Sequence, residues 1–127
     1  MLDNFIKFKN YRGVDLNFKE NLSIKDSFIF INCSNFNIII ENKINKILLQ
    51  NCHNFNIIFR DTISGIDIDN SKDISLKKTN LDYNDNLSYL NIFNSKVSVF
   101  YDNINNISDF MIDHQNSVIE FKQIENK

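Results

Sequence analysis

The chain has 127 residues and a formal net charge of −2, and it contains 23 Asn, 21 Ile and 12 Phe but only 2 Gly, with no Pro and no Ala. This length fits one domain over residues 1–127, and an apolar set made of β-branched and aromatic residues argues against a helical bundle. The 14 basic residues are dispersed, with Lys77-Lys78 as the densest pair, so the charge pattern excludes a typical nucleic-acid-binding protein.

Two cysteines are too few for a disulfide scaffold, and they fit a reducing compartment. The first ten residues contain no charged segment followed by an apolar one, and no apolar run approaches ~18 residues. We therefore expect a soluble cytoplasmic protein that does not bind a membrane.

In chain order, the first element is a weak copy of a repeat that starts at Asn10. The repeat is clearest in residues 32–40 and 51–59, which read Asn-Cys-Ser-Asn-Phe-Asn-Ile-Ile-Ile and Asn-Cys-His-Asn-Phe-Asn-Ile-Ile-Phe at an offset of 19. A third copy starts at Asn70, and weaker copies start at Asn94 and Asn116. Helical repeats need ~33 or more residues per unit, so this period favours a β-solenoid. We predict an all-β fold, a right-handed parallel β-helix of about six short coils.

Alternation within the second and third coils predicts which side chains point inward. These are Phe36, Ile38, Ile40, Ile47, Leu49, Phe55, Ile57, Phe59, Ile66 and Ile68. Ile39 and Ile58 fall at outward positions, where they are either ordinary surface residues or a stacked apolar patch for a partner. The Asn residues lie at the corners, because Asn tolerates the left-handed backbone conformation there.

The segment from Thr79 to Asp85 lengthens the repeat spacing from 19 to 24 residues. We interpret it as a loop that projects from the solenoid, either as structural padding or as part of a binding site.

Cys33 and Cys52 occupy equivalent positions in successive coils, ~4.8 Å apart. This spacing allows a disulfide, or a metal site with His53, but an inward ladder of small side chains continued by Ser71 is the simpler interpretation. His53 should point away from Cys52, and His114 is expected to be a surface imidazole. We predict no metal and no cofactor.

Polysaccharide-cleaving β-helix enzymes carry carboxylates in outward rows, and the chain has Asp61, Asp67, Asp69 and Asp73. Their spacings of 6, 2 and 4 residues predict that they lie on different faces of the coil, whereas two catalytic carboxyl groups need a shared cleft. No phosphate-binding glycine loop or nucleophile motif is present, so we predict that the protein is not an enzyme.

The run from Phe28 to Leu76 resembles the C-terminal β-helix of cyclase-associated proteins. The resemblance rests on residues 30–33, 43–52, 57–61 and 64–73, including the stretch Ser64-Gly65-Ile66-Asp67-Ile68-Asp69-Asn70-Ser71-Lys72-Asp73. Flanking coils, from Phe5 to Ile24 and from Leu87 to Phe121, fit more loosely. The order and spacing of the segments match, so the resemblance covers nearly the whole chain.

This resemblance implies a cytoplasmic, cytoskeletal protein that binds monomeric actin, prefers the ADP form and promotes nucleotide exchange during filament turnover. It resembles the short, single-domain forms of unicellular parasites. The family also forms homodimers through an exchanged C-terminal hairpin, yet only six residues follow Phe121 here. Arg60 departs from the family, which usually has an acidic residue before the position of Asp61.

For the actin-binding surface, solvent-facing placement and the resemblance together suggest Lys43, Asn45, Lys46, Arg60, Asp61, Lys72 and Lys77. A different class remains open, because a related β-helix occurs in tubulin-folding cofactor C, which stimulates GTP hydrolysis by supplying an arginine. The chain offers only Arg12 and Arg60 for that role.

Overall fold

A computed structural model describes residues 4–19, 21–79, 88–101 and 110–124. All the secondary-structure elements assigned within these residues are β-strands. The described residues contain no helix long and apolar enough to cross a membrane. The ten strands are β1 (Asn4–Lys9), β2 (Arg12–Phe18), β3 (Asp26–Ile31), β4 (Ser34–Gln50), β5 (His53–Asp69), β6 (Lys72–Lys78), β7 (Ser88–Phe93), β8 (Lys96–Tyr101), β9 (Phe110–Gln115) and β10 (Val118–Gln123).

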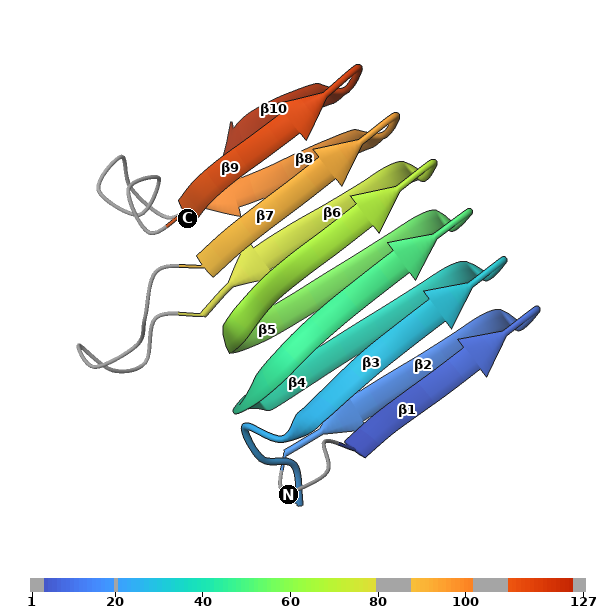
Figure 1. Cartoon of the computed structure of the whole chain (residues 1–127), viewed down its shortest axis with the longest axis vertical. Coiled ribbons are helices and arrows are strands. Elements are labelled where there is room, and N and C mark those ends of the chain that lie inside the picture. Colours follow the sequence, from blue (N-terminus) through green and yellow to red (C-terminus); the bar gives the residue numbers. More distant parts are fainter. Residues whose placement is uncertain (1–3, 20, 80–87, 102–109, 125–127) are drawn as a thin grey trace.

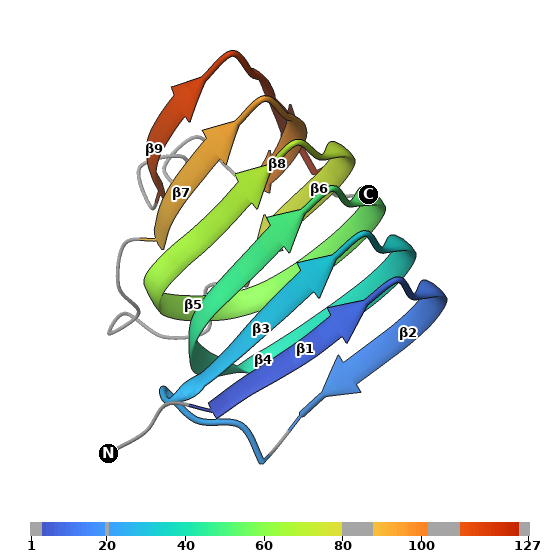
Figure 2. The same cartoon turned by 45° about the vertical axis from the view of Figure 1, so that its right-hand side comes forward.

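The strands stack as six rungs of a flattened parallel solenoid with two sheets (Figures 1 and 2). Sheet 1 contains β1, β3, the second half of β4, the second half of β5, β7 and β9. Sheet 2 contains β2, the first halves of β4 and β5, β6, β8 and β10. All pairings are parallel, which confirms the predicted β-solenoid of about six coils.

The core lies between the two sheets and consists of stacked apolar ladders. All ten side chains predicted to point inward in the second and third coils are at most 2% exposed. Aromatic rings continue from rung to rung: Phe36 and Phe55 stack with centroids 4.8 Å apart, and Phe8 and Phe30 with centroids 5.3 Å apart. Parallel, in-register strands place like residues above each other, so a sequence repeat becomes a continuous core.

Each rung turns from sheet 1 to sheet 2 at an asparagine with positive φ, between 48° and 65°. These corner residues are Asn10, Asn32, Asn51, Asn70, Asn94 and Asn116. Their side chains also bond along the axis, since the Asn116 amide donates to Asn94 Oδ1 at 2.8 Å and the Asn70 amide donates to Asn51 Oδ1. Asparagine therefore supplies the left-handed corner that glycine usually provides, as the sequence predicts.

The residue after each corner asparagine from the second rung onward is small and points inward. Ser71 Oγ accepts a hydrogen bond from the Cys52 amide at 3.0 Å, and Ser95 Oγ accepts one from the Ser71 amide at 3.0 Å. Cys33 and Cys52 are buried free thiols in the same ladder, which confirms the interpretation as small inward side chains. His53 is exposed, so it points away from Cys52.

The opposite bend breaks the strict 19-residue register. The pairing offset falls from 19 at Ile40/Phe59 to 18 at Ile44/Thr62 and returns to 19 at Lys46/Gly65. As a result Ile44 is buried, whereas Ile63, which lies 19 residues further along the chain, is 44% exposed. The predicted loop at 79–85 lies, after Thr79, outside the described residues.

Candidate functional site

The outer face of sheet 2 is mostly polar. A row of short side chains runs along it from Asp15 through Asn37, Asn56, Ser75 and Ser98 to Glu120. The Asn56 amide donates to Asn37 Oδ1 at 2.9 Å, and the Asn37 amide donates to Asp15 Oδ1 at 2.9 Å. These side chains hydrogen-bond to one another, so fewer donors and acceptors remain on this face for a partner.

Ile39 and Ile58 stack in the next outward row of sheet 2, as the sequence predicts, and both are half-buried. The row continues through Lys77 to Phe100. Ile124 lines the same groove, of about 310 Å³, with Ile58 and Phe100. Ile124, the last described residue, thus lies against part of this apolar row.

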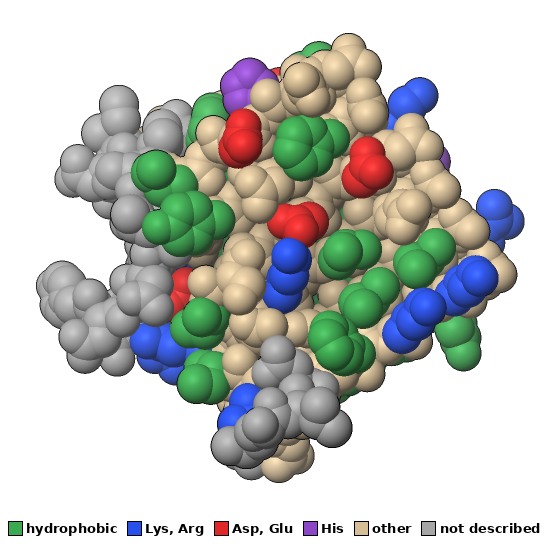
Figure 3. All heavy atoms as spheres, viewed as in Figure 1, with side chains coloured by type: hydrophobic (Ala, Val, Ile, Leu, Met, Phe, Trp, Pro, Cys, Tyr) green, Lys and Arg blue, Asp and Glu red, His purple; other side chains and the backbone are tan. Residues whose placement is uncertain are grey.

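The outer face of sheet 1 carries apolar, basic and acidic side chains (Figure 3). Its residues fall into three rows along the solenoid axis. The middle row contains Lys7, Ile29, Leu48, Asp67, Asn91 and Asp113. The corner-side row contains Lys9, Ile31, Gln50, Asp69, Phe93 and Gln115. The bend-side row contains Phe5, Ser27, Lys46, Gly65, Tyr89 and Met111.

Apolar side chains are unusually exposed on this outer face. Phe5 is 64% exposed, Met111 52% and Tyr89 49%. Ile29, Ile31, Leu48 and Phe93 lie between them and are half-buried. Exposed apolar side chains that lie in adjacent rows of a rigid sheet are typical of a protein-binding surface.

Charge on this outer face changes sign along the axis. Lys7 and Lys9 lie on the first rung, whereas Asp67 and Asp69 lie on the fourth and Asp113 on the sixth. Figure 3 shows the acidic side chains near the centre of this face mainly in its upper half. Opposite charges at the two ends favour one orientation of a bound partner over the reverse.

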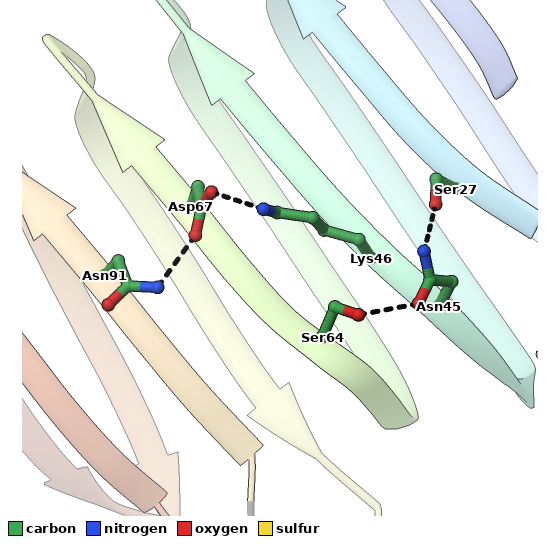
Figure 4. A network of polar contacts seen from close by, with 6 residues as sticks. All are labelled: Ser27, Asn45, Lys46, Ser64, Asp67 and Asn91. Carbon is green, nitrogen blue, oxygen red and sulfur yellow. Dashed lines mark hydrogen bonds and ion pairs between the residues drawn. The ribbon is translucent and has the colours of Figure 1, made fainter.

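A polar network fixes the middle of the face (Figure 4). Lys46 Nζ lies 2.7 Å from Asp67 Oδ2, and the Asn91 amide donates to Asp67 Oδ1 at 2.9 Å. The Asn45 amide donates to Ser27 Oγ at 3.1 Å, and Asn45 Oδ1 accepts from Ser64 Oγ at 2.7 Å. Four successive rungs are thereby linked through side chains, so the face is held in a defined shape.

A groove of about 670 Å³ lies beside this network and is the candidate binding site. Leu48, Asp67, Asp69, Asn91 and Phe93 line it, together with Gln50 and Gln115. Its walls combine apolar side chains with carboxylates, and the Asp69 side chain is exposed. The groove can therefore receive an apolar side chain with a cationic or donor group beside it.

Of the residues expected from sequence at the actin surface, only Asn45 and Lys46 lie on the outer side of sheet 1. Lys72 lies next to the asparagine corner, where it pairs in register with His53. Lys77 lies in the apolar row of sheet 2. Lys43 and Arg60 are half-buried at the bend. The structure therefore does not bring the seven residues together on one surface.

The prediction that Asp61 faces solvent is wrong, because the structure buries this side chain completely. Its Oδ1 accepts the Thr62 amide at 2.9 Å and lies 3.7 Å from Lys78 Nζ. Asp61 continues the inward alternation of Ile57 and Phe59, and Lys78 takes the inward position that follows Leu76 in sheet 2. Asp61 is a structural residue rather than part of a binding surface.

The prediction that the four aspartates lie on different faces is wrong for two of them. Asp67 and Asp69 share the outer side of sheet 1 and line the same groove. Two residues apart on one strand, they point the same way. Asp73 lies on sheet 2, where Oδ2 is 3.2 Å from His53 Nε2, and Asp61 is inside.

The thiols and imidazoles offer little reactive chemistry in the described part of the chain. Burial raises the pKa of Cys52 from 9.0 to about 11, which suppresses the thiolate form at neutral pH. Residues 4–19, 21–79, 88–101 and 110–124 contain no group of three side chains that could hold a metal ion. His114 is exposed, as predicted, on the last described rung.

Sequence reasoning missed the aromatic and apolar residues of the outer sheet 1 surface, namely Phe5, Tyr89, Phe93 and Met111. Because side chains alternate along a strand, Phe5 points outward next to inward Ile6, and Phe93 points outward next to inward Ile92. That signal was present in the sequence, but it gains meaning only when rungs from both ends of the chain are aligned.

Comparisons with known proteins agree with this architecture. The family described as "Adenylate cyclase associated (CAP) C terminal" matches residues 4–100. No curated protein matches the chain. Among solved structures, the crystal structure of cyclase-associated protein from Cryptosporidium parvum is similar, with a TM-score of 0.78 and 20% sequence identity, and the match covers 100% of this chain and 75% of that chain. At that identity the structural likeness concerns the fold.

Proposed function

Since this chain belongs to the family of adenylate cyclase-associated protein C-terminal domains, we propose that it acts as a binding domain for monomeric actin. The proposal extends to a preference for the ADP form and to promotion of nucleotide exchange, which would support filament turnover. Residues 1–127 would act as one cytoplasmic, cytoskeleton-associated domain, either alone or as a homodimer of the family type. Its role would be binding rather than catalysis.

The observation that carries the proposal is the outer side of sheet 1. It combines exposed apolar side chains, an internally braced polar network and a groove on a rigid solenoid. A rigid face of this kind can select one conformation of a flexible partner. If it binds best the actin conformation with the more open nucleotide cleft, exchange follows from the shift in population.

The test is a direct binding measurement with fluorescent monomeric actin, loaded with ADP or with ATP. We expect micromolar or tighter binding to ADP-actin, weaker binding to ATP-actin, and faster release of a fluorescent nucleotide. Asp69→Lys should weaken binding at least tenfold, because it reverses a charge in the groove. Asp15→Lys, the same change on sheet 2, serves as the matched control. Absence of binding to ADP-actin at micromolar concentrations would refute the function.

The alternative is activation of a GTPase by a supplied arginine. Such an arginine must reach a phosphate of the partner. Arg60 is half-buried at the bend, and its Nε is enclosed. Arg12 is exposed but donates to Ser34 Oγ at 3.4 Å on the edge of sheet 2. These positions favour actin binding over GTPase activation.

A further inference from the structure

Basic residues are dispersed in the sequence, but stacking gathers several of them into one row along the solenoid axis. This row contains the second residue after each corner asparagine, at the start of sheet 2, and the corners lie at the right-hand ends of the strands in Figure 1. Strand pairing aligns its first four members, and backbone hydrogen bonds to the preceding rung continue it through the last two. We call it the corner row; its members are Arg12, Ser34, His53, Lys72, Lys96 and Val118.

Three consecutive rungs of the corner row carry basic side chains. His53, Lys72 and Lys96 are all exposed, and rungs ~4.8 Å apart place them within about 10 Å along the axis. Figure 3 shows Lys and Arg side chains along the right-hand edge of the molecule, on the side of the corners. The neighbouring outward row of sheet 2 is uncharged at the same three rungs, where it consists of Asn56, Ser75 and Ser98. The corner row is therefore a positive line in a chain whose net charge is −2.

A groove of about 750 Å³ opens beside the last three rungs of the corner row. Lys72 and Lys96 line it, and Asp73 is the one carboxylate among the described residues of its walls. The Asp73 carboxylate is already engaged, since Oδ2 lies 3.2 Å from His53 Nε2. Val118, also in the wall, is 53% exposed. The groove thus combines two lysines with an apolar contact.

We propose that the corner row binds an extended acidic segment of a partner protein, laid along the solenoid axis. Carboxylates of the segment would pair with Lys72 and Lys96, and an apolar side chain between them would contact Val118. This surface is separate from the one used by the proposed function. Asn94 lines both this groove and the groove of sheet 1, so the acidic segment would lie beside the proposed actin site.

The backbone of the corner row favours carboxylates over phosphates. Compact phosphate sites typically use converging backbone amides or an arginine fork. Here the amides of His53, Lys72 and Lys96 already donate to carbonyl oxygens of the preceding rung, at 3.1, 3.1 and 2.9 Å. The cationic donors are side chains spread along a line, which matches a row of carboxylates.

The lining of the groove also favours a peptide over a nucleic acid. Proteins that bind single strands stack the bases on aromatic side chains. The described residues that line this groove include no aromatic ring other than the imidazole of His114. A nucleic acid would therefore gain only its phosphate contacts, whereas an acidic peptide can also use the apolar contact at Val118.

The test is fluorescence anisotropy of a labelled peptide of about eight glutamates, titrated with the intact chain. We expect micromolar binding at ~50 mM salt that weakens about tenfold at ~300 mM salt, because salt screens exposed charges. Lys72→Glu combined with Lys96→Glu should weaken binding at least tenfold, since two attractions become repulsions. Lys7→Glu combined with Lys122→Glu is the matched control, because it changes the net charge equally at two exposed lysines outside the corner row.

Nuclear magnetic resonance of the isotope-labelled chain locates the bound peptide. The amide signals of His53, Lys72 and Lys96 should shift on titration, whereas those of Leu48 and Asp67 on sheet 1 should not. Shifts centred on sheet 1, absence of binding, equal losses in the two double variants, or tighter binding of a polyphosphate of equal charge would each overturn the proposal. These measurements contain no actin, so their outcome is independent of the proposed function.

Discussion

Gly65 lies directly against the backbone of Tyr89 on the next rung of sheet 1. Its φ is +90°, and a Cβ added there would lie 2.4 Å from the carbonyl oxygen of Tyr89. Since that oxygen belongs to the backbone, a side chain would force two rungs apart. The site needs glycine for both its conformation and its space.

We predict that Gly65→Ala destabilises the protein by about 2–5 kcal/mol, the sum of left-handed strain of ~1–2 kcal/mol and overpacking of ~1–3 kcal/mol. Urea unfolding followed by circular dichroism measures this change. Gly13→Ala is the matched control, because Gly13 has a φ of +72° but no heavy atom within 4 Å of an added Cβ. Equal losses in the two variants would show that the contact with Tyr89 has no cost.

At the scale of the elements, the bend of β5 is joined to β6 and β7 by a buried polar cluster. Asp61 Oδ1 lies 3.7 Å from Lys78 Nζ, and Ser88 Oγ donates to Asp61 at 3.5 Å. The side chains of Asp61 and Lys78 are 0% and 3% exposed. This cluster connects β5 to β6 and β7, the two strands that flank residues 80–87.

Replacing one member of the buried Asp61–Lys78 pair should lower the free energy of unfolding much more than replacing both members. We predict that Asp61→Leu costs about 3–5 kcal/mol, because it leaves the Lys78 ammonium buried without this partner. Adding Lys78→Met should recover a large part of the loss. Urea unfolding of both single variants and the double variant gives the coupling energy. Additive losses would contradict a direct interaction.

An exposed pair provides the reference for this experiment. Lys122 Nζ and Glu120 Oε2 lie 3.7 Å apart, the same separation, but both side chains are 50% exposed. Lys122→Met should therefore change stability by less than about 1 kcal/mol. The contrast isolates burial as the cause of the large effect at Asp61.

The elements show where sequence reasoning works and where it stops. Alternation correctly predicts buried residues such as Phe36 and Ile57, because period two holds wherever a strand is regular. It stops holding across the bend, where the inward positions change from odd-numbered residues such as Phe59 to even-numbered ones such as Ile66, so that Ile63 is exposed. A change of one residue in the alternation reverses the side to which a side chain points.

At the scale of the whole molecule, the two outer faces of the solenoid differ in what they offer a partner. Sheet 1 carries the groove lined by Asp67 and Asp69, whereas the side-chain amides of sheet 2 bond to one another. We predict that actin binding responds to Asp69→Lys and not to Asp15→Lys, as measured with fluorescent monomeric actin. Equal effects of the two changes would contradict use of sheet 1.

The sequence by itself determines the architecture of this protein. The 19-residue period, the alternating Ile and Phe, and the corner asparagines specify a parallel solenoid, because each coil repeats the same local choices. The same residues indicate the family. These features are local or periodic, so they can be detected without knowing which segments meet in space.

Only the tertiary structure decides which surface is available for binding. Of the seven residues expected at the partner surface, Asn45 and Lys46 lie on sheet 1, whereas Asp61 is buried. The charge reversal from Lys7 to Asp113 becomes visible only when the first and last rungs are aligned in one row. The physical reason is that stacking turns the sequence through two sheets, so the composition of a face depends on register at each bend and not on spacing along the chain.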